Sequence, residues 1–290
     1  MRQRLIGAAV LVPVVVILFV AGPPWLTLGI ALLAAAAAYE IALLIKSAGL
    51  PANRWLVVAA PLLVAAAVAY GYGPNAAIVS AGFFVPAAGV WVILTAIDAF
   101  RRPDPRDGFL GWAGTLLGSL YASLLIFTTV IVALGGSTSN VPLQLPLGLD
   151  LGRYLLLILV VTVWALDSFT FLAGKYHGRG RFMNHISPNK TWSGAIGGAV
   201  AAVVVSTVLF AVGNMDPMAG VIVGAVIAVT AQAGDIAESM LKRAAGAKDS
   251  GTLIPGHGGF LDRVDSFLFA APAMYATLIV ILHFNPFAIL

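Results

Sequence analysis

Long apolar runs separated by short polar connections dominate this chain of 290 residues. The runs lack the period-two alternation of membrane β-strands, and most are about 20 residues long, enough for a helix to cross a bilayer. We therefore predict an all-α polytopic integral membrane protein with about nine transmembrane helices. The predicted spans cover residues 5–22, 25–45, 55–72, 76–98, 112–134, 154–173, 192–212, 219–241 and 266–284.

The composition supports this class. The chain is 60% hydrophobic and 10% charged, whereas a soluble domain is usually about 25% charged. It contains no cysteine, which excludes disulfides, thiolate catalysis and cysteine-bound metals. The basic and then apolar start at Met1 is similar to a signal peptide, but we interpret it as a retained first span.

The positions of the basic residues predict the orientation. If nine spans alternate, 15 of the 16 lysines and arginines fall on one side, and only Arg153 falls on the other. Basic residues stay cytoplasmic during insertion. The sequence therefore predicts a protein of the cell (inner) membrane with a cytoplasmic N-terminus.

Small residues are frequent in the early spans, for instance at 34–38, and they let helices approach closely in lipid. Such faces permit a homodimer without requiring one. We expect residues 1–110 to be structural or oligomerisation helices. Residues 111–290 are expected to carry an active site at the cytoplasmic face, both parts forming one continuous membrane domain.

Acidic residues are few, and half of the 12 lie at or near the predicted cytoplasmic interface. These six are Asp167, Asp235, Glu238, Asp249, Asp262 and Asp265. Ionisable groups within spans are costly and are functional candidates. Asp235 lies deeper than Glu238 and therefore needs a cation or a basic partner. The spacing of Glu238 and Lys242 also fits a structural ion pair on one helix face.

The polar connection before the last span, "PGHGGFLDRVDS", combines glycines with carboxylates. Glycines permit close backbone approach, so that N–H groups can cradle phosphate oxygens; a plain tight turn is the alternative. Asp262 and Asp265 are three residues apart and can point the same way. Oxygen ligands suit Mg²⁺, which takes one or two carboxylates plus substrate phosphates. For His257 we favour hydrogen bonding over metal ligation.

A second candidate anion site is the stretch Ser187-Pro188-Asn189-Lys190-Thr191, at the start of the seventh span. Helix N-termini attract phosphate through their N–H groups and the helix dipole. The neighbouring Arg179 and Arg181 also fit the ordinary positive-inside signal. Together these patterns indicate metal-dependent phosphoryl or nucleotidyl transfer onto a lipid.

The stretch "SMLKRAAGAKDSGTLIPGHGGFLDRVDS" resembles the signature of phosphatidate cytidylyltransferases, also called CDP-diacylglycerol synthases. The matching positions are Ser239, Lys242, Arg243, Lys248, Asp249, Pro255, His257, Gly258, Gly259, Asp262, Arg263 and Asp265. The segments "DSFTFLAGK", "SPNKTWSG" and "QAGDIAES" also resemble family elements. One position departs, because Ser193 stands where the family commonly has Glu.

The resemblance implies the reaction CTP + phosphatidate → CDP-diacylglycerol + pyrophosphate in phospholipid biosynthesis. It implies Mg²⁺, with a second, monovalent cation left open, and no nucleic-acid partner. Asp235 and Asp262 would hold the metal, with Asp265 and Asp167 either as further ligands or as residues that support the ligands. Lys242 and Arg263 would join Asp235 and Asp262 as catalytic residues. The substrate-binding residues would be Ser187, Lys190, Thr191, Ser239, Arg243, Lys248, Asp249, His257, Gly258 and Gly259.

The sequence has two other possible interpretations. A transporter of an anionic or phosphorylated substrate would place its carboxylates near mid-membrane, on helices broken in pairs. Here the acidic residues crowd one interface. CDP-alcohol phosphotransferases carry an Asp-Gly pair followed by Ala-Arg, and the single Asp-Gly pair of this chain, at 107–108, is followed by other residues.

Overall fold

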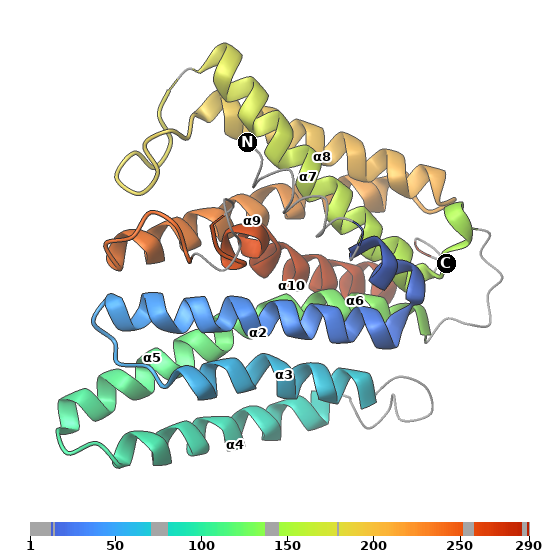
Figure 1. The fold of residues 1–290 in the computed structure, drawn as a ribbon. Coiled ribbons are helices and arrows are strands. Elements are labelled where there is room, and N and C mark those ends of the chain that lie inside the picture. Colours follow the sequence, from blue (N-terminus) through green and yellow to red (C-terminus); the bar gives the residue numbers. More distant parts are fainter. Residues whose placement is uncertain are drawn as a thin grey trace. The chain divides into compact units, whose positions relative to one another are not determined.

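The computed structural model describes residues 13, 15–70, 81–136, 145–178, 180–251, 258–285 and 289. Within this part of the chain the regular structure is helical, and an isolated β-bridge pairs Arg181 with Thr191. The prediction of an all-α membrane protein is therefore confirmed (Figure 1).

Within the described residues, six helical stretches are long and apolar enough to cross a membrane. They are Pro23–Ser47, Pro105–Leu134, Leu151–His177, Trp192–Val212, Pro217–Ala244 and Leu261–Phe284. The predicted spans at 55–72 and 76–98 correspond to shorter apolar helices, Arg54–Tyr70 and Pro86–Phe100. Most of the first predicted span lies outside the described residues, so the count of nine stays a prediction.

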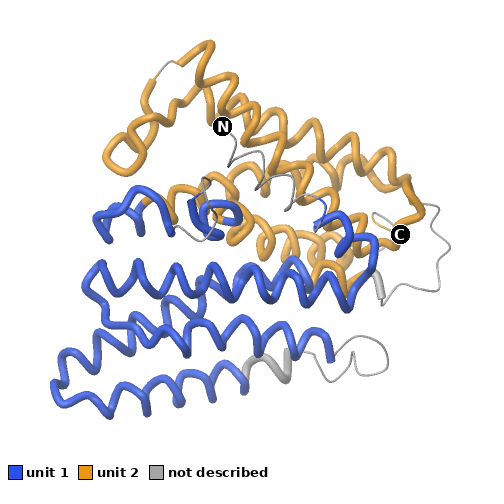
Figure 2. The backbone as a smooth tube through the Cα atoms, viewed as in Figure 1, with its two compact units in different colours: residues 1–129, 240–264 blue, residues 130–239, 265–290 orange. Residues whose placement is uncertain are grey.

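The chain forms two compact units (Figure 2). Unit 1 comprises residues 1–129 and 240–264, and unit 2 comprises residues 130–239 and 265–290. The predicted boundary at residue 110 falls inside unit 1. The functional division that it expressed, between structural and catalytic helices, stays a prediction.

The helices of unit 1 are α2 (Pro23–Ser47), α3 (Arg54–Tyr70), α4 (Ala81–Phe100), α5 (Pro105–Ser123) and the short η1 (Leu124–Ile126), with the end of α9 (Pro217–Ala244) and the start of α10 (Leu261–Phe284). Helix α2 packs on α3 and α5, and α4 packs on α5. Gly118 permits the close packing of α5, because a Cβ there would lie 3.0 Å from Val57 and 3.2 Å from Ile45.

The helices of unit 2 are most of α6 (Phe127–Gly136), the short η2 (Pro146–Gly148), α7 (Leu151–His177), α8 (Trp192–Val212) and the larger parts of α9 and α10. Helices α7 and α8 pack together along their length. A hydrogen bond joins the start of α7 to the end of α8, where the Tyr154 hydroxyl donates to the Leu209 carbonyl at 2.7 Å. Glycine again sets the spacing, since a Cβ at Gly194 would lie 2.8 Å from the Thr170 carbonyl oxygen.

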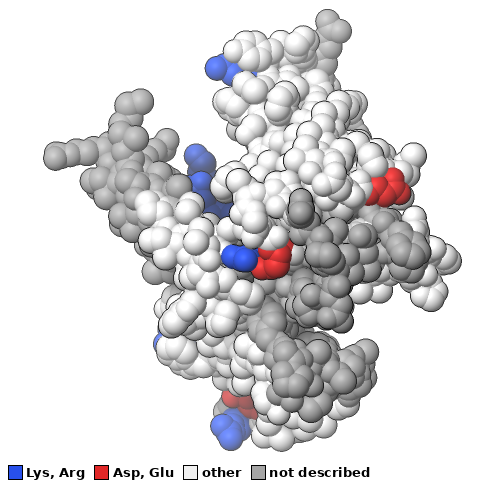
Figure 3. Space-filling view, turned by 90° about the vertical axis from the view of Figure 1, so that its right-hand side faces the viewer, with Lys and Arg blue, Asp and Glu red and all other residues white. Residues whose placement is uncertain are grey.

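The outer face of α8 is suited to lipid. A row of side chains four residues apart is 52–61% exposed, and it consists of Ile196, Val200, Val204, Val208 and Val212. Exposing such an apolar patch to water would be unfavourable, whereas hydrocarbon accepts it. The molecular face drawn in Figure 3 likewise carries few charged side chains.

Candidate functional site

Three carboxylates of unit 2 lie together. Asp235, Glu238 and Asp265 each offer one oxygen atom, and these atoms lie within 4.8 Å of one another. Asp235 and Glu238 are three residues apart on α9, so they share one helix face. Glu238 is only 1% exposed, and Asp265 comes from α10.

A glycine allows this meeting of α9 and α10. A Cβ at Gly234 would lie 2.5 Å from the Asp265 carbonyl oxygen and 3.4 Å from the Ser266 Cα. Only a residue without a side chain permits such close backbone approach. Gly234 therefore explains why the residue next to it, Asp235, reaches the carboxylate of α10.

The charges of this cluster need compensation, because carboxylates that share a site repel one another. Lys190 supplies one positive charge, with its Nζ 2.7 Å from Asp235 Oδ2. It is the basic partner that the depth of Asp235 required. The Ser239 hydroxyl lies 3.5 Å from Asp235 Oδ1. The donor set is made only of oxygen atoms and carries excess negative charge, so it fits a hard cation such as Mg²⁺.

The local fold of residues 180–192 holds Lys190 in place. The bridge between Arg181 and Thr191 closes this segment, and the Phe182 N–H donates to the Lys190 carbonyl at 2.8 Å. The rings of Phe182 and Trp192 pack with their centroids 4.5 Å apart. The short pairing thus directs the Lys190 side chain towards α9.

Thr191 begins α8 as its N-cap, since its Oγ1 accepts a hydrogen bond from the Gly194 N–H at 3.1 Å. The Trp192 N–H donates to the Gly180 carbonyl at 2.9 Å. Two N–H groups of the first turn are therefore engaged within the chain. The expected anion contact at this helix start depends more on Lys190 and Ser187 than on these two amides.

A small cavity of 20 Å³ adjoins this point. Asp167, Lys190, Thr191, Gln232 and Asp235 contribute polar groups to its wall. This volume holds a water molecule, which needs about 10–15 Å³, and is far below the roughly 300 Å³ of a small-molecule pocket. A small-molecule substrate would therefore lie against these residues rather than within the cavity.

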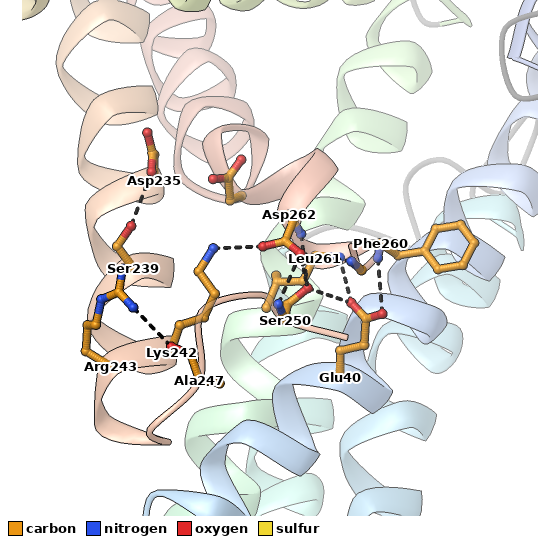
Figure 4. A network of polar contacts seen from close by, with 12 residues as sticks. Glu40, Asp235, Ser239, Lys242, Arg243, Ala247, Ser250, Phe260, Leu261 and Asp262 are labelled. Atoms are coloured by element: carbon orange, nitrogen blue, oxygen red, sulfur yellow. Dashed lines mark hydrogen bonds and ion pairs between the residues drawn. The ribbon is translucent and has the colours of Figure 1, made fainter. Parts of the chain in front are cut away.

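Asp262 is the centre of a second cluster, in unit 1 (Figure 4). Its Oδ1 binds Lys242 Nζ at 2.7 Å, and both side chains are mostly buried, at 15% and 13% exposed. Its Oδ2 accepts hydrogen bonds from the Ser250 N–H at 3.0 Å and from the Gly259 N–H at 2.8 Å. The Ser250 hydroxyl lies 2.9 Å from the same oxygen.

The glycines before α10 are required by this packing. Gly258 has φ +78°, which favours glycine, and a Cβ there would lie 2.7 Å from Asp262 Oδ2. Because the Gly259 N–H is donated to Asp262, this amide serves the protein rather than standing ready for a phosphate. A tight backbone arrangement around a carboxylate is thus part of what the glycine-rich signature encodes.

The remaining predicted residues lie near these clusters in sequence. Arg243 donates to the Ala247 carbonyl at 3.3 Å. Three further charged residues are exposed, namely Lys248, Asp249 and Arg263. Ser187 accepts a backbone hydrogen bond from Lys190 at 3.3 Å. His257 lies outside the described residues.

The structure thus brings Asp235, Lys190 and Asp167 to one place in unit 2, and Asp235 also meets Asp265. It groups Asp262 with Lys242 in unit 1. Sequence reasoning missed two members of these clusters. Glu238 was counted among the acidic candidates and as an ion-pair partner but not among the metal ligands, and Glu40 was overlooked.

Glu40 lies on α2 and is 1% exposed. A signal for it was present, because it is the single acidic residue of the apolar helix α2, and acidic residues within spans are functional candidates. The chain has two glutamates, and both are buried in these clusters.

Comparison with known proteins shows the family of the chain. The model of the Cytidylyltransferase family matches residues 2–281. A phosphatidate cytidylyltransferase of Synechocystis sp. is 30% identical over 297 residues, covering 97% of each chain. Proteins of the same name from Brucella abortus and Bacillus subtilis are 43% and 42% identical over 124 and 118 residues, which is 41% and 40% of this chain and 45% and 44% of theirs. The chain belongs to the cytidylyltransferase family.

Proposed function

We propose that this protein is a phosphatidate cytidylyltransferase, which transfers the cytidylyl group of CTP to phosphatidate and releases pyrophosphate. The observation that carries the proposal is the meeting of Asp235, Glu238 and Asp265 beside Lys190, in a chain whose family match spans residues 2–281. A nucleotidyltransferase needs a cation site next to fixed positive charge, and these residues provide both.

The chemistry explains why such residues are needed. The phosphate of phosphatidate is already anionic near neutral pH, so attack on the α-phosphorus of CTP needs no strong base. The main obstacle is repulsion between two polyanions. A bound Mg²⁺ would neutralise phosphate charge and help to align the in-line attack. The protein side chains hold the reacting groups and stabilise charge on the departing pyrophosphate.

Asp235, Glu238 and Asp265 are the proposed Mg²⁺ ligands. Asp167 and Asp262 remain proposed further carboxylates of the centre. The Asp262 oxygens receive hydrogen bonds from Lys242, Ser250 and Gly259. If Asp262 bound the metal directly, one of these hydrogen-bond donors would have to be replaced by the metal. If Asp262 instead holds Lys242 in place for catalysis, its hydrogen bonds can stay as they are. A monovalent cation remains a further proposal.

Basic and hydroxyl side chains are proposed to bind the phosphates. Lys190 is held by Asp235 and Lys242 by Asp262, each at 2.7 Å. Anchoring each ammonium fixes its position before substrate arrives, which lowers the cost of ordering it later. The other proposed phosphate or nucleotide contacts are Ser187, Thr191, Ser239, Arg243, Lys248, Asp249, His257, Gly258 and Arg263. Gly259 is proposed to serve substrate binding indirectly, because its N–H holds Asp262.

The site is proposed to face the cytoplasm, where CTP is made. The positive-inside pattern supports this, because the segments that carry Lys190 and Lys242 hold 8 of the 16 basic residues. A homodimer stays a prediction, since the proposed chemistry uses residues of one chain. The mass of the purified protein in detergent, measured by light scattering, tests it.

The test is an assay of purified protein in mixed micelles with CTP and Mg²⁺. We expect release of pyrophosphate and formation of a cytidylyl lipid that both require phosphatidate. Diacylglycerol, which lacks the phosphate nucleophile, is the matched control and should give neither product. CTP hydrolysis that does not depend on the lipid would contradict the proposal. Uptake of an anion into proteoliposomes without any chemical change would also contradict it.

A further inference from the structure

Glu40 makes a set of contacts that the proposed chemistry does not use. Its Oε2 accepts from the Leu261 N–H at 2.8 Å, and its Oε1 accepts from the Phe260 N–H at 3.1 Å. The Ser250 hydroxyl lies 3.1 Å from Oε2. All of these residues belong to unit 1, and Figure 4 shows the carboxylate of α2 pointing at the start of α10.

These contacts cap α10 from another helix. The first N–H groups of a helix have no partner within it, and they attract negative charge. Glu40 supplies that charge from a position 220 residues away in the chain. Asp262 accepts from the Gly259 N–H, so two carboxylates together bind the amides of three consecutive residues.

The glycines around Glu40 are independent support. A Cβ at Gly251 would lie 2.5 Å from Glu40 Oε1. A Cβ at Gly259 would overlap both the Ser250 hydroxyl and the Glu40 carboxylate. The backbone therefore wraps around this carboxylate on two sides, at positions where only glycine fits.

The consequence reaches the Lys242–Asp262 pair. The Ser250 hydroxyl stands between the two carboxylates, 3.1 Å from Glu40 and 2.9 Å from Asp262. Glu40 also fixes Leu261, the residue before Asp262. Loss of the Glu40 charge would weaken the attachment of the start of α10. The Asp262 carboxylate, which holds Lys242, would then be less firmly positioned.

We propose that Glu40 is a positioning residue for catalysis, which holds the start of α10 so that Asp262 fixes Lys242. This inference rests on the proposed function. It assigns a role in catalysis to a helix within residues 1–110, which were expected to be structural or to serve oligomerisation.

The decisive variant is Glu40→Gln. A glutamine amide has one acceptor oxygen for three donors, and its NH₂ would face an N–H or hydroxyl donor. We expect kcat to fall roughly 10- to 100-fold, as small misplacements of reacting groups do, while KM for CTP changes much less. Glu40→Asp keeps the charge and should recover a large part of the lost kcat.

Hydrogen exchange provides a readout that needs no turnover. Backbone amides at 260 and 261 should exchange roughly 10- to 100-fold faster in Glu40→Gln, because a hydrogen bond to a charged acceptor is lost. Amides of α3 should keep their rates. Ser119→Ala, at another buried hydroxyl of unit 1, is the control and should change neither exchange at 260–261 nor kcat.

Unchanged exchange at 260–261 and unchanged kcat in folded Glu40→Gln would overturn the inference. If that variant does not fold, Ser250→Ala removes one donor to the same carboxylate and should shift both readouts in the same direction. If the wild-type protein lacked cytidylyl transfer, the proposed function would fail, while the exchange measurement would still decide whether Glu40 holds the start of α10.

Discussion

Single charged residues carry most of the chemistry that this membrane protein offers. With 10% charged residues, each buried charge must have a partner or a function. Asp235 contacts Lys190, and Asp262 contacts Lys242. Asp235 differs from Asp262 because two further carboxylates lie beside it. It is therefore the residue at which metal binding and substrate binding are expected to meet.

Asp235→Asn should lower turnover by more than about 100-fold, because even residues behind a metal ligand cost 10- to 100-fold when replaced. Turnover of folded protein at saturating Mg²⁺ measures this. Asp216→Asn is the matched control just before the same helix, where the side chain accepts from the Met218 N–H at 2.9 Å and asparagine caps as well. Near wild-type turnover in Asp235→Asn would contradict the proposal that Asp235 is a metal ligand.

Glu238→Gln should raise the Mg²⁺ concentration for half-maximal turnover by about tenfold or more, because one ligand charge is lost from the cluster. A titration of initial rate against Mg²⁺ measures the shift. Asp107→Asn, at an exposed acid of α5, should leave the titration curve unchanged. An unaltered Mg²⁺ dependence in Glu238→Gln would contradict Mg²⁺ binding by Glu238 and indicate a structural role for its carboxylate.

In both units the positions of the helices depend on glycines, which lack a side chain and so let a neighbouring helix approach closely. Gly118 sets α5 against α3, and Gly194 sets α8 against α7. In lipid the hydrophobic effect does not draw helices together, so close packing at small residues has this role. Gly234 is the case with a chemical consequence, because the α10 backbone that it approaches belongs to Asp265.

Gly234→Ala should separate α9 from α10 and destabilise the protein by about 1–3 kcal/mol, as overpacking does. Turnover should fall because Asp265 moves away from Asp235 and Glu238. Thermal unfolding in detergent and the rate assay measure the two effects. Gly89→Ala on α4 is the control, since a Cβ there meets nothing within 4 Å. Equal behaviour of the two variants would contradict the role of Gly234.

The whole molecule combines a lipid-facing exterior with charge gathered in a few connections. The exposed row on α8 fits hydrocarbon, whereas the segments around Lys190 and Lys242 hold many of the basic residues. Charge on one side of the predicted spans orients the chain during insertion. The orientation decides whether the substrate can reach the site, because CTP can enter from the cytoplasm only if these segments face it.

Single cysteines test the orientation, since the chain has none of its own. In right-side-out vesicles, a membrane-impermeant maleimide should label Met218→Cys and spare His185→Cys until the membrane is permeabilised. Both side chains are exposed, so access to the reagent decides the result. Labelling of His185→Cys in sealed vesicles would place the Lys190 segment outside and contradict the proposed cytoplasmic site.

The sequence by itself determined the membrane class, the helical composition and the family. Apolar runs near 20 residues leave few alternatives in a bilayer, where backbone groups must bond within their own segment. It also located the acidic residues that matter, because a charge is rare in such a chain. Asp235 and Asp265 were recognised in this way.

Only the tertiary structure decided which of these residues meet. The contact of Glu40 with Leu261 joins residues 221 positions apart, and no local pattern encodes it. The pairing of Asp235 with Lys190, and the closeness of Glu238 to Asp265, depend on helices that approach at glycines. Sequence spacing describes one helix face, whereas distances between helices are set by packing, and packing is a property of the folded chain.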